Sequence, residues 1–387
     1  MSDILIATGT RADWGLLSPL AKALRKVPGI DVRILATNMH LQQQYGNTVS
    51  EIIADGFTPD ACVPLPEGDS ALDRAIAMAA CLEGAAREMA RLKPDMLVIL
   101  GDRYEMLAVA SAATMLGIPI AHLHGGELTY GAIDDNIRHA ISKLAALHFT
   151  STEAARQRLI AMGEEPGRVV CSGAIGVWSF CNFSPMSRTE LEESLGFSLD
   201  SPLFLATFHS ATLDPEDPAL RCRAMLEAID AFPDHKTIVT YPNNDPRSEG
   251  IIREIKAYAG SRPDKVLLIP SLGLRRYQSV LRFADAVIGN SSSGILEVPS
   301  AGIPTVNIGI RQDGRDRAPS VIDCGDSADE IRSAIAKAIS PGFKAMAAKA
   351  PNPYFKDNTL EIIVETISGA DFNNLKTKKF HHICTDR

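Results

Sequence analysis

The sequence predicts an α/β fold with two Rossmann-like domains, and three observations lead to this prediction. Short apolar runs that end in Gly, Thr, Asn or His alternate with amphipathic segments along most of the chain. Such an alternation is typical of βαβ units around a buried parallel sheet. The alternation breaks once, at residues 177–187, and then restarts. A chain of 387 residues with 45% hydrophobic residues also exceeds the size at which one core usually divides into two.

The first series contains six predicted strands separated by helical segments. Residues 14–27 carry leucines on one stripe, and residues 104–116 are rich in Ala and Leu, so both are predicted helices. The predicted strands are "ILIATGT" (4–10), "DVRILAT" (31–37), "DMLVILGD" (95–102), "IPIAHLHGG" (118–126), "LHFTST" (147–152) and "RVVCSG" (168–173).

The second series again contains six predicted strands. They are "PLFLATFH" (202–209), "HKTIVTYP" (235–242), "DKVLLIP" (264–270), "DAVIGN" (285–290), "IPTVNIG" (303–309) and "SVIDC" (320–324). Pro, Ser and aromatic residues at 177–187 indicate a linker, and residues 358–367 form a last amphipathic segment.

These boundaries predict an N-terminal Rossmann-like domain over residues 1–176 and a C-terminal Rossmann-like domain over 188–350. A helix and tail over 351–387 are expected to pack back toward the N-terminal domain. Ligands of such sheets bind beyond the carboxyl ends of the strands. We therefore expect a ligand cleft between the two domains.

Composition argues against several kinds of partner. The net charge of −8 is spread along the chain, and the longest basic stretch is the tail segment "KTKKFHH", so nucleic-acid binding is not expected. No stretch approaches the roughly 20 apolar residues of a membrane span, so no membrane association is expected. The seven cysteines lack CxxC spacing, which argues against a disulfide framework and favours a cytoplasmic protein.

A polar cluster follows one of the predicted strands. The stretch "HLHGGELTYGAIDDNIRH" (122–139) contains three histidines, three carboxylates and three glycines. Asp102 ends another strand and is expected at the same sheet edge as His124 and Glu127. Carboxylates gathered in a partly buried cleft have pKa values pushed apart, so one of them holds a proton while another accepts one. The cluster therefore predicts general acid–base chemistry.

Other interpretations of the same residues remain open. Asp134 and Asp135 fall near a helix N-terminus, where acidic side chains also serve simply as caps. His122 is equally well a core histidine. His122, His124 and Glu127 present a possible zinc site, but no cysteine and no HExxH helix supports one, so no metal is expected.

Further motifs indicate a site for a phosphate-containing ligand. "TGTRADWGLL" places Arg11 between a strand and a helix, and "VIGNSSSGILEVPSAGIP" (287–304) places serines before a short predicted helix. Glu297 is expected in the first turns of that helix, positioned for a ribose diol. Arg315 lies in a glycine-containing loop that either faces a diphosphate or is simply solvated. The GxGxxG fingerprint is absent from the first βα turn, so no nicotinamide cofactor is indicated.

Taken together, five motifs resemble those of the hydrolysing UDP-N-acetylglucosamine 2-epimerases and their relatives that act on UDP-2,4-diacetamido-2,4,6-trideoxyglucose. They are "GTRADWGLL", "GDRYE", "HLHGGE", "DDNIRHAISKL" and "GNSSSGILEVPSAGIPTVNIGIRQDGR", and the resemblance covers roughly residues 4–365. It implies a fold of the glycosyltransferase-B type. It also implies cleavage of UDP-N-acetylglucosamine to UDP and N-acetylmannosamine, as in sialic acid biosynthesis, through a 2-acetamidoglucal and without a cofactor. A homo-oligomer, either a dimer or a tetramer, is also implied.

The resemblance implies roles for individual residues. The expected catalytic residues are Asp102, His124, Glu127, Asp134 and His209. Some family members have a catalytic glutamate where this chain has His124, so either His124 or Glu127 takes that role. The expected substrate-binding residues are Arg11, Arg103, Arg138, Ser291, Ser292, Gly294, Glu297 and Arg315.

Two other functions use the same fold. The first is a UDP-sugar glycosyltransferase, but many retaining transferases carry a second glutamate eight residues after the first, where this chain has Thr305. The second is a UDP-sugar-binding protein without activity, which the presence of both Asp102 and Asp134 disfavours.

Overall fold

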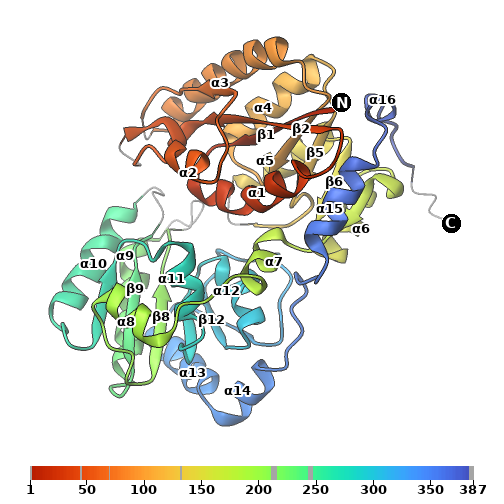
Figure 1. Cartoon of the computed structure of the whole chain (residues 1–387). Helices are drawn as coiled ribbons and strands as arrows, with labels where there is room; N and C mark the ends of the chain where they lie inside the picture. The colour runs from red at the N-terminus through yellow and green to blue at the C-terminus, as the bar shows by residue number, and fades with distance from the viewer. Residues whose placement is uncertain are drawn as a thin grey trace. The chain divides into compact units, whose positions relative to one another are not determined.

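The computed structural model describes residues 2–43, 46–68, 70–130, 133–210, 216–242 and 247–382. The chain divides into two compact units (Figure 1). The first unit contains residues 1–127, 134–179 and 355–387, and the second contains 128–133 and 180–354. Within the described ranges, no helix combines the length and apolarity needed to cross a membrane.

The first unit is built on a seven-stranded parallel sheet with the order β3-β2-β1-β4-β5-β6-β7. Its strands are β1 (Ser2–Thr8), β2 (Ile30–Thr37), β3 (Ala61–Val63), β4 (Met96–Leu100), β5 (Ile120–Leu123), β6 (Leu147–Thr150) and β7 (Val169–Cys171). The sequence predicted all of these except β3. An edge strand of three residues is too short to show an apolar period.

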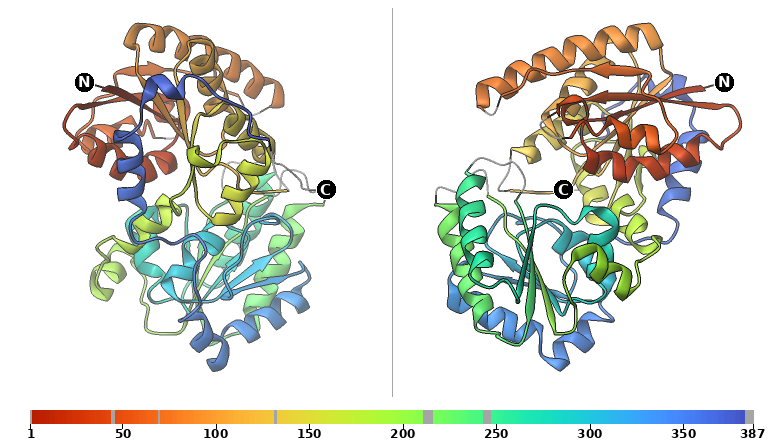
Figure 2. Two further views of the ribbon diagram at one scale, coloured as in Figure 1. Left: turned by 90° about the vertical axis from the view of Figure 1, so that its right-hand side faces the viewer. Right: turned by 60° about the vertical axis from the view of Figure 1, so that its left-hand side comes forward.

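Helices cover both faces of this sheet (Figure 2). They are α1 (Arg11–Leu24), α2 (Val49–Ala54), α3 (Ala71–Leu92), α4 (Tyr104–Met115), α5 (Asp134–Leu144), α6 (Glu153–Ala161), α7 (Ile175–Cys181), α15 (Thr359–Ser368) and α16 (Phe372–Leu375), with short 3-10 turns η1 (Asn38–Leu41) and η3 (Pro166–Arg168). Apolar residues of α1 and α15 share one core with the sheet, and those of α3 and α4 share the other.

Local sequence signals explain where several of these helices begin. Thr10 caps α1, because its side chain accepts a hydrogen bond from the backbone N–H of Asp13. Ser70 and Asp73 form a reciprocal capping box at the start of α3. The predicted linker at 177–187 is partly wrong, since α7 occupies its first five residues. The apolar side chains of Val177 and Phe180 are buried, which stabilises helix there despite the breakers that follow.

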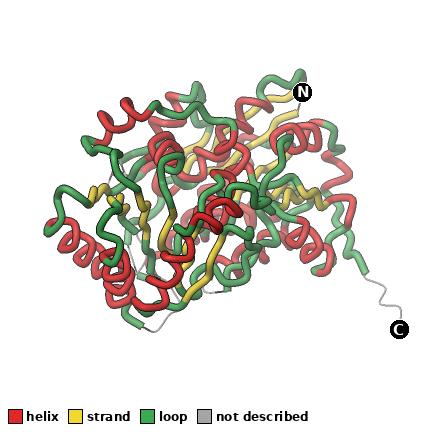
Figure 3. The backbone as a smooth tube through the Cα atoms, turned by 90° about the horizontal axis from the view of Figure 1, so that it is seen from below, coloured by secondary structure: helices red, strands yellow, loops and turns green. Residues whose placement is uncertain are grey.

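The second unit repeats the architecture with a six-stranded parallel sheet of order β10-β9-β8-β11-β12-β13. The strands are β8 (Leu203–Thr207), β9 (Lys236–Thr240), β10 (Val266–Ile269), β11 (Ala286–Gly289), β12 (Thr305–Ile308) and β13 (Val321–Cys324). All six match predicted apolar runs. The strands of both sheets, drawn in yellow in Figure 3, lie among the helices.

The helices of the second unit again lie on both faces of its sheet. They are α8 (Arg188–Leu195), α9 (Pro218–Asp230), α10 (Ser248–Gly260), α11 (Gly273–Val280), α12 (Ser293–Leu296), α13 (Ala328–Ala338) and α14 (Pro341–Ala347), with the 3-10 turn η4 (Val298–Ala301). Residues of α9, α10 and α13 form one core, and residues of α8 and α11 form the other. Each unit thus has the strand order of a doubly wound fold, in which the carboxyl ends of the central strands present the functional loops.

Candidate active site

In the first unit, the polar motifs follow four neighbouring strands. β1, β4, β5 and β6 lie side by side and parallel, so their carboxyl ends share one edge. Asp102 follows β4, and His124 and Glu127 follow β5, as the sequence predicted. Ser151 follows β6, and the backbone N–H of His124 donates to the carbonyl of Phe149 on that strand at 2.8 Å.

Arg138 on α5 connects the carboxylates of this edge. Its side chain is 2% exposed and ion-pairs with Asp102, whose Oδ2 accepts from Nε at 2.9 Å and also from Nη2. Nη1 donates to the carbonyl of Glu127 at 2.8 Å and to Asp135 Oδ1 at 3.2 Å. Burial alone would lower the pKa of Arg138, but the neighbouring carboxylates outweigh it and raise that pKa. The arginine is therefore a fixed cation that orients Asp102.

His124 and Glu127 form a second pair at the same edge. His124 Nδ1 lies 3.3 Å from Glu127 Oε1, and Ser151 Oγ donates to that same oxygen at 2.7 Å. His124 has a φ of 64°, a left-handed conformation that non-glycine residues seldom adopt. Its Nε2 is buried and has no hydrogen-bond partner among the described residues. A carboxylate thus orients one ring nitrogen and leaves the other for proton transfer.

His122 has a structural role. It is fully buried, with Nδ1 3.1 Å from Ser142 Oγ and Nε2 2.7 Å from the carbonyl of Gly101. Burial lowers its pKa to about 3, so the imidazole is neutral at physiological pH. Of the two interpretations of His122, the structure supports the core histidine. Over the described ranges, no group of three His, Cys, Asp or Glu residues is arranged to hold a metal ion.

A buried carboxylate that the sequence analysis missed, that of Glu105, lies where β1 and β4 end. Arg103 Nε donates to Glu105 Oε1 at 2.5 Å, and Glu105 is fully buried. That carboxylate packs so closely on Gly9 that a β-carbon there would lie 2.6 Å from Oε1. Burial, and to a lesser extent the nearby Glu105, raise the pKa of Asp13 to about 6. Arg103, predicted to contact substrate, is thus tied to a carboxylate of its own motif.

Two further predicted residues begin helices of the first unit. Asp134 is the first residue of α5 and is exposed. Arg11 is the first residue of α1, and its Nη1 lies 3.9 Å from Glu51 Oε1 with both side chains about half exposed. Both residues lie in segments that follow the carboxyl ends of strands, which agrees with their expected location.

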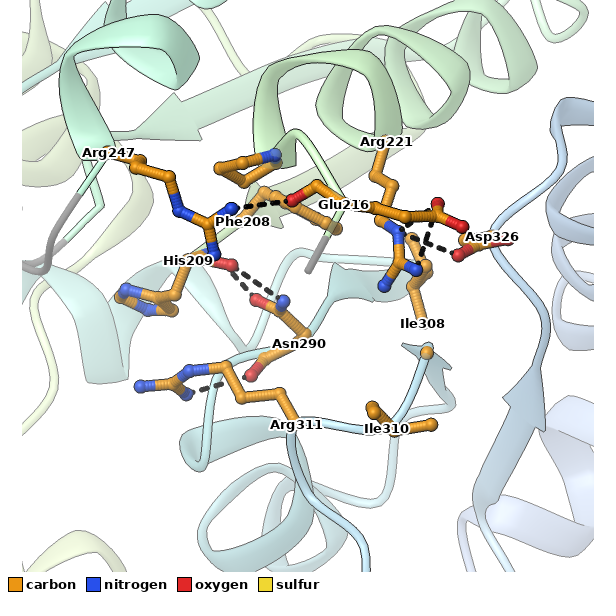
Figure 4. Close-up of a pocket in the computed structure, with 12 residues that line it drawn as sticks. Phe208, His209, Glu216, Arg221, Arg247, Asn290, Ile308, Ile310, Arg311 and Asp326 are labelled. Carbon is orange, nitrogen blue, oxygen red and sulfur yellow. Dashed lines mark hydrogen bonds and ion pairs between the residues drawn. The ribbon is translucent and has the colours of Figure 1, made fainter. Parts of the chain in front are cut away.

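The second unit has a pocket at the carboxyl ends of β8, β11 and β12 (Figure 4). Three arginines and two carboxylates line this pocket, so its charge is weakly positive. Its lining residues are Phe208, His209, Glu216, Pro218, Arg221, Arg247, Asn290, Ile308, Gly309, Ile310, Arg311 and Asp326. Arg221 is neutralised by Glu216 Oε2 at 3.0 Å and by Asp326 Oδ2 at 2.8 Å.

Asn290 connects His209 and Arg311 at this pocket through hydrogen bonds. Its amide accepts a hydrogen bond from the backbone N–H of His209 at 2.7 Å and donates to the carbonyl of His209 at 2.9 Å. The carbonyl of Asn290 accepts from Arg311 Nη1 at 3.0 Å and from Gln312 Nε2 at 2.9 Å. Figure 4 shows Arg247 and Arg311 on either side of His209. Burial, reinforced by the Arg311 cation, lowers the pKa of His209 to about 3.

The serine-rich segment after β11 differs from the prediction in one respect. Helix α12 has only four residues, and Glu297 is its C-cap rather than a residue of its first turns. The 3-10 turn η4, which has Pro299 at its second position, follows directly and prevents a longer helix. Gly294 packs against Thr305, where a β-carbon would lie 2.8 Å from Cγ2, so close packing requires this glycine. Ser291 and Ser292 precede the helix.

Arg315 lies in the loop between β12 and β13, and its carbonyl accepts a hydrogen bond from Arg317 Nη1 at 2.7 Å. The sequence analysis missed Ser151, Arg221 and Arg247. Each of them follows the carboxyl end of a strand or begins the segment after it. A systematic search for polar residues after every strand, rather than for motifs, would have identified them.

Comparisons with known proteins identify the family. A family model described as UDP-N-acetylglucosamine 2-epimerase matches residues 22–368. The chain belongs to this family. Its 2-epimerase relatives include the GDP/UDP-N,N'-diacetylbacillosamine 2-epimerase (hydrolyzing) of Campylobacter jejuni, which is 37% identical over 341 residues covering 88% of each chain. The polysialic acid biosynthesis protein P7 of Escherichia coli is 35% identical over 382 residues, covering 98% of this chain and 96% of the relative.

Solved structures of 2-epimerases share the fold. The crystal structure of the UDP-GlcNAc 2-epimerase from Neisseria meningitidis bound to UDP-GlcNAc has a TM-score of 0.81 at 18% identity, covering 95% of this chain and 100% of that one. The crystal structure of the UDP-GlcNAc 2-epimerase from Methanocaldococcus jannaschii in complex with UDP-GlcNAc and UDP has a TM-score of 0.75 at 18% identity, covering 96% of this chain and 100% of that one. The predicted glycosyltransferase-B type of fold is therefore confirmed, as is the resemblance to the 2-epimerase family.

Proposed function

We propose that the protein is a hydrolysing 2-epimerase that converts UDP-N-acetylglucosamine to UDP and N-acetylmannosamine. Family membership and the arrangement of the first unit support this reaction. The observation that carries it is the pairing of His124 with Glu127 beside an Asp102 that Arg138 orients. Proton transfer at a weakly acidic carbon requires acid and base groups held at fixed positions, and these contacts supply them.

The proposed reaction has two stages. In the first, a base removes the proton from C2 of the sugar and the C1–O bond breaks, so that UDP leaves with the electron pair and a 2-acetamidoglucal forms. In the second, water adds its oxygen to C1 while a proton is delivered to C2 on the opposite face. The overall change consumes one water and inverts C2.

We assign the roles in the first unit as follows. His124 Nε2 exchanges a proton with the substrate, and Glu127 orients the ring through Nδ1. Asp102, held by Arg138, acts on the other stage together with Asp134 at the start of α5. Inversion at C2 requires one group that removes the proton from one face and a second group that delivers a proton to the opposite face. Arg11 and Arg103 contact the sugar or its diphosphate.

The second unit is proposed to bind UDP. His209 and Arg311 face a weakly positive pocket at the carboxyl edge of its sheet, which suits a diphosphate. Ser291, Ser292 and Gly294 border this edge, and Glu297 accepts hydrogen bonds from the ribose hydroxyls. Arg315 adds positive charge in the neighbouring loop. Because His209 is neutral at physiological pH, it serves as a hydrogen-bond donor to phosphate rather than as a cation.

A second substrate is supported by the names of two relatives. The proteins of Campylobacter jejuni and Legionella pneumophila, 37% and 36% identical to this chain, are named N,N'-diacetylbacillosamine 2-epimerases. Their sugar carries an acetamido group at C4 and a methyl group at C5 where N-acetylglucosamine carries a hydroxyl and a hydroxymethyl group. The same proton transfers at C2 serve both sugars.

The experiment is incubation of the purified protein in deuterium oxide with each UDP-sugar, followed by proton NMR of the released sugar. We expect free UDP, a sugar with the manno configuration and deuterium at C2. The faster substrate identifies the natural one. A product without deuterium at C2 would exclude elimination, and transfer of the sugar only when an acceptor is added would indicate a glycosyltransferase instead.

A further inference from the structure

A tail segment of the chain is fastened to the helix that carries Arg138. Residues 374–382, called the strap here, begin in the last turn of α16 and run beside α5 and α6, as the blue trace in Figure 2 shows. Arg168 donates to the carbonyls of Asn374 at 3.2 Å and Thr377 at 3.0 Å. The backbone N–H of His381 donates to the carbonyl of Gly163 at 2.8 Å. The strap is thus docked through its backbone at both ends.

Lys378 caps the C-terminal end of α5 from the middle of the strap. Its Nζ donates to the carbonyls of Lys143 and Ala145, both at 2.7 Å, and reaches that of Ser142 at 3.3 Å. These are carbonyls at the end of α5 that lack an intrahelical partner. The end of a helix is its negative pole, so an ammonium group there is favourable.

The same ammonium completes a buried ionic cluster. Glu164 is 2% exposed and accepts from Lys378 at 2.7 Å, from Lys143 at 2.6 Å and from His148 at 3.0 Å. Burial would raise the pKa of Glu164, but these hydrogen bonds together lower it to about 2. The carboxylate is therefore charged at neutral pH, and its contact with Lys378 helps to hold the ammonium group at the helix end.

The ring of Phe380 packs against Gly163, next to this cluster. Gly163 has a φ of 92°, and a β-carbon built there would lie 2.4 Å from the ring of Phe380. Lys143 Nζ lies 5.2 Å from the centre of that ring. The glycine is thus required both by its backbone conformation and by the aromatic side chain of the strap.

The far end of α5 leads into the candidate active site. Two residues before the end of α5, Ser142 contacts His122, which in turn contacts the carbonyl of Gly101 next to Asp102. One turn earlier, Arg138 holds Asp102 itself. A shift of α5 along its axis would move these contacts together, and misplacement of about 1 Å is enough to cost a large part of a catalytic rate.

We propose that the strap is a positioning element for α5 and that Lys378 is the positioning residue that fixes the helix relative to β4 and β5. The strap lies beyond residues 22–368, which match the family model, so this role is additional to what the family match describes. The inference rests on the proposed function for its effect on turnover. Its structural part stands independently of the substrate.

The test compares Lys378→Met with Lys379→Met, since the neighbouring Lys379 is exposed. We expect Lys378→Met to lower kcat by about tenfold while KM and the Kd for UDP change less than twofold. Amide hydrogen exchange should quicken in α5 but not in α13 of the second unit. Lys379→Met should match the wild type in each measurement, and Lys378→Arg should restore much of kcat, because it keeps the charge at the helix end.

Phe380→Ala provides a second variant, because its ring is 62% exposed and its removal should not prevent folding. We expect faster exchange in α5 and a smaller fall in kcat. A tail that only stabilises the fold would lower the unfolding temperature of Lys378→Met and leave kcat unchanged well below that temperature, which would overturn the proposal. If the wild type turns over no UDP-sugar, the proposed function is wrong. The proposal that the strap positions α5 is tested separately, and unchanged hydrogen exchange in α5 of Lys378→Met would contradict it.

Discussion

At the scale of residues, the candidate site depends on side chains that hold one another. Glu127 accepts a hydrogen bond from Ser151 at the same oxygen that faces His124. Arg138 forms an ion pair with Asp102. Of the proposed catalytic groups, Glu127 thus has a hydrogen-bond donor and Asp102 has a partner of opposite charge. Such pairs act as units, so their removal should have effects that are not additive.

The pair of His124 and Glu127 provides the first prediction. We expect His124→Ala and Glu127→Gln each to lower kcat by about 100-fold, because each removes the same oriented proton-transfer group. The double variant should lose little more than either single variant. Steady-state kinetics of the three proteins measure this, and a loss near 10,000-fold in the double variant would mean that the two residues act independently.

Asp13 provides a prediction about pH. Its folded pKa of about 6 lies above the ordinary value of 3.8, so the folded state holds a proton that the unfolded chain releases. The resulting stabilisation is complete below about pH 4 and is lost as the pH rises through 6. Asp13→Asn should therefore gain stability relative to the wild type, by about 2–3 kcal/mol between pH 4 and pH 8. Urea unfolding at both pH values checks this, and a constant difference between the two proteins would contradict it.

At the scale of elements, close packing of neighbouring strands within a sheet places the loops that follow them side by side. Gly289 at the end of β11 pairs with Thr207 of β8 and has a φ of 135°. A β-carbon there would lie 1.8 Å from the carbonyl oxygen of Thr207. The pairing of the two strands thus requires glycine immediately before Asn290, the residue that clamps His209.

Gly289→Ala should be strongly destabilising, by more than about 3 kcal/mol, because neither the clash nor the backbone conformation can relax without breaking the strand pair. Gly15→Ala is the matched control. Gly15 lies within α1 with no atom within 4 Å of the added carbon, so this change should raise stability by about 0.5–1 kcal/mol. Thermal unfolding of both variants is the measurement, and a wild-type unfolding temperature for Gly289→Ala would contradict the strand geometry.

At the scale of the whole molecule, the chain divides its proposed tasks between two units. The first unit carries the proposed acid–base groups, and the second carries the pocket proposed to bind UDP. Substitutions in the two units should therefore affect different kinetic constants.

Asp102→Asn should lower kcat by at least 100-fold and leave the Kd for UDP within twofold of the wild type. Glu297→Gln should weaken UDP binding about tenfold, because a neutral acceptor forms weaker hydrogen bonds to the ribose hydroxyls than a carboxylate does. Titration calorimetry with UDP and steady-state kinetics together test both expectations. Loss of UDP binding in Asp102→Asn would show that the tasks are not divided in this way.

The sequence by itself determined the two series of βαβ units, twelve of the thirteen strands found in the described residues, and the family, because buried parallel strands and the motifs at their ends are local patterns. It also placed Asp102 and His124 at one sheet edge. Only the tertiary structure decided that His122 is a buried structural residue, that Glu127 faces His124, and that Asp13 lies near Glu105 and Arg103. Only the tertiary structure shows that Lys378 donates hydrogen bonds to carbonyls at the end of α5. These relations join residues far apart in the chain, and burial and charge depend on neighbours that no local pattern contains.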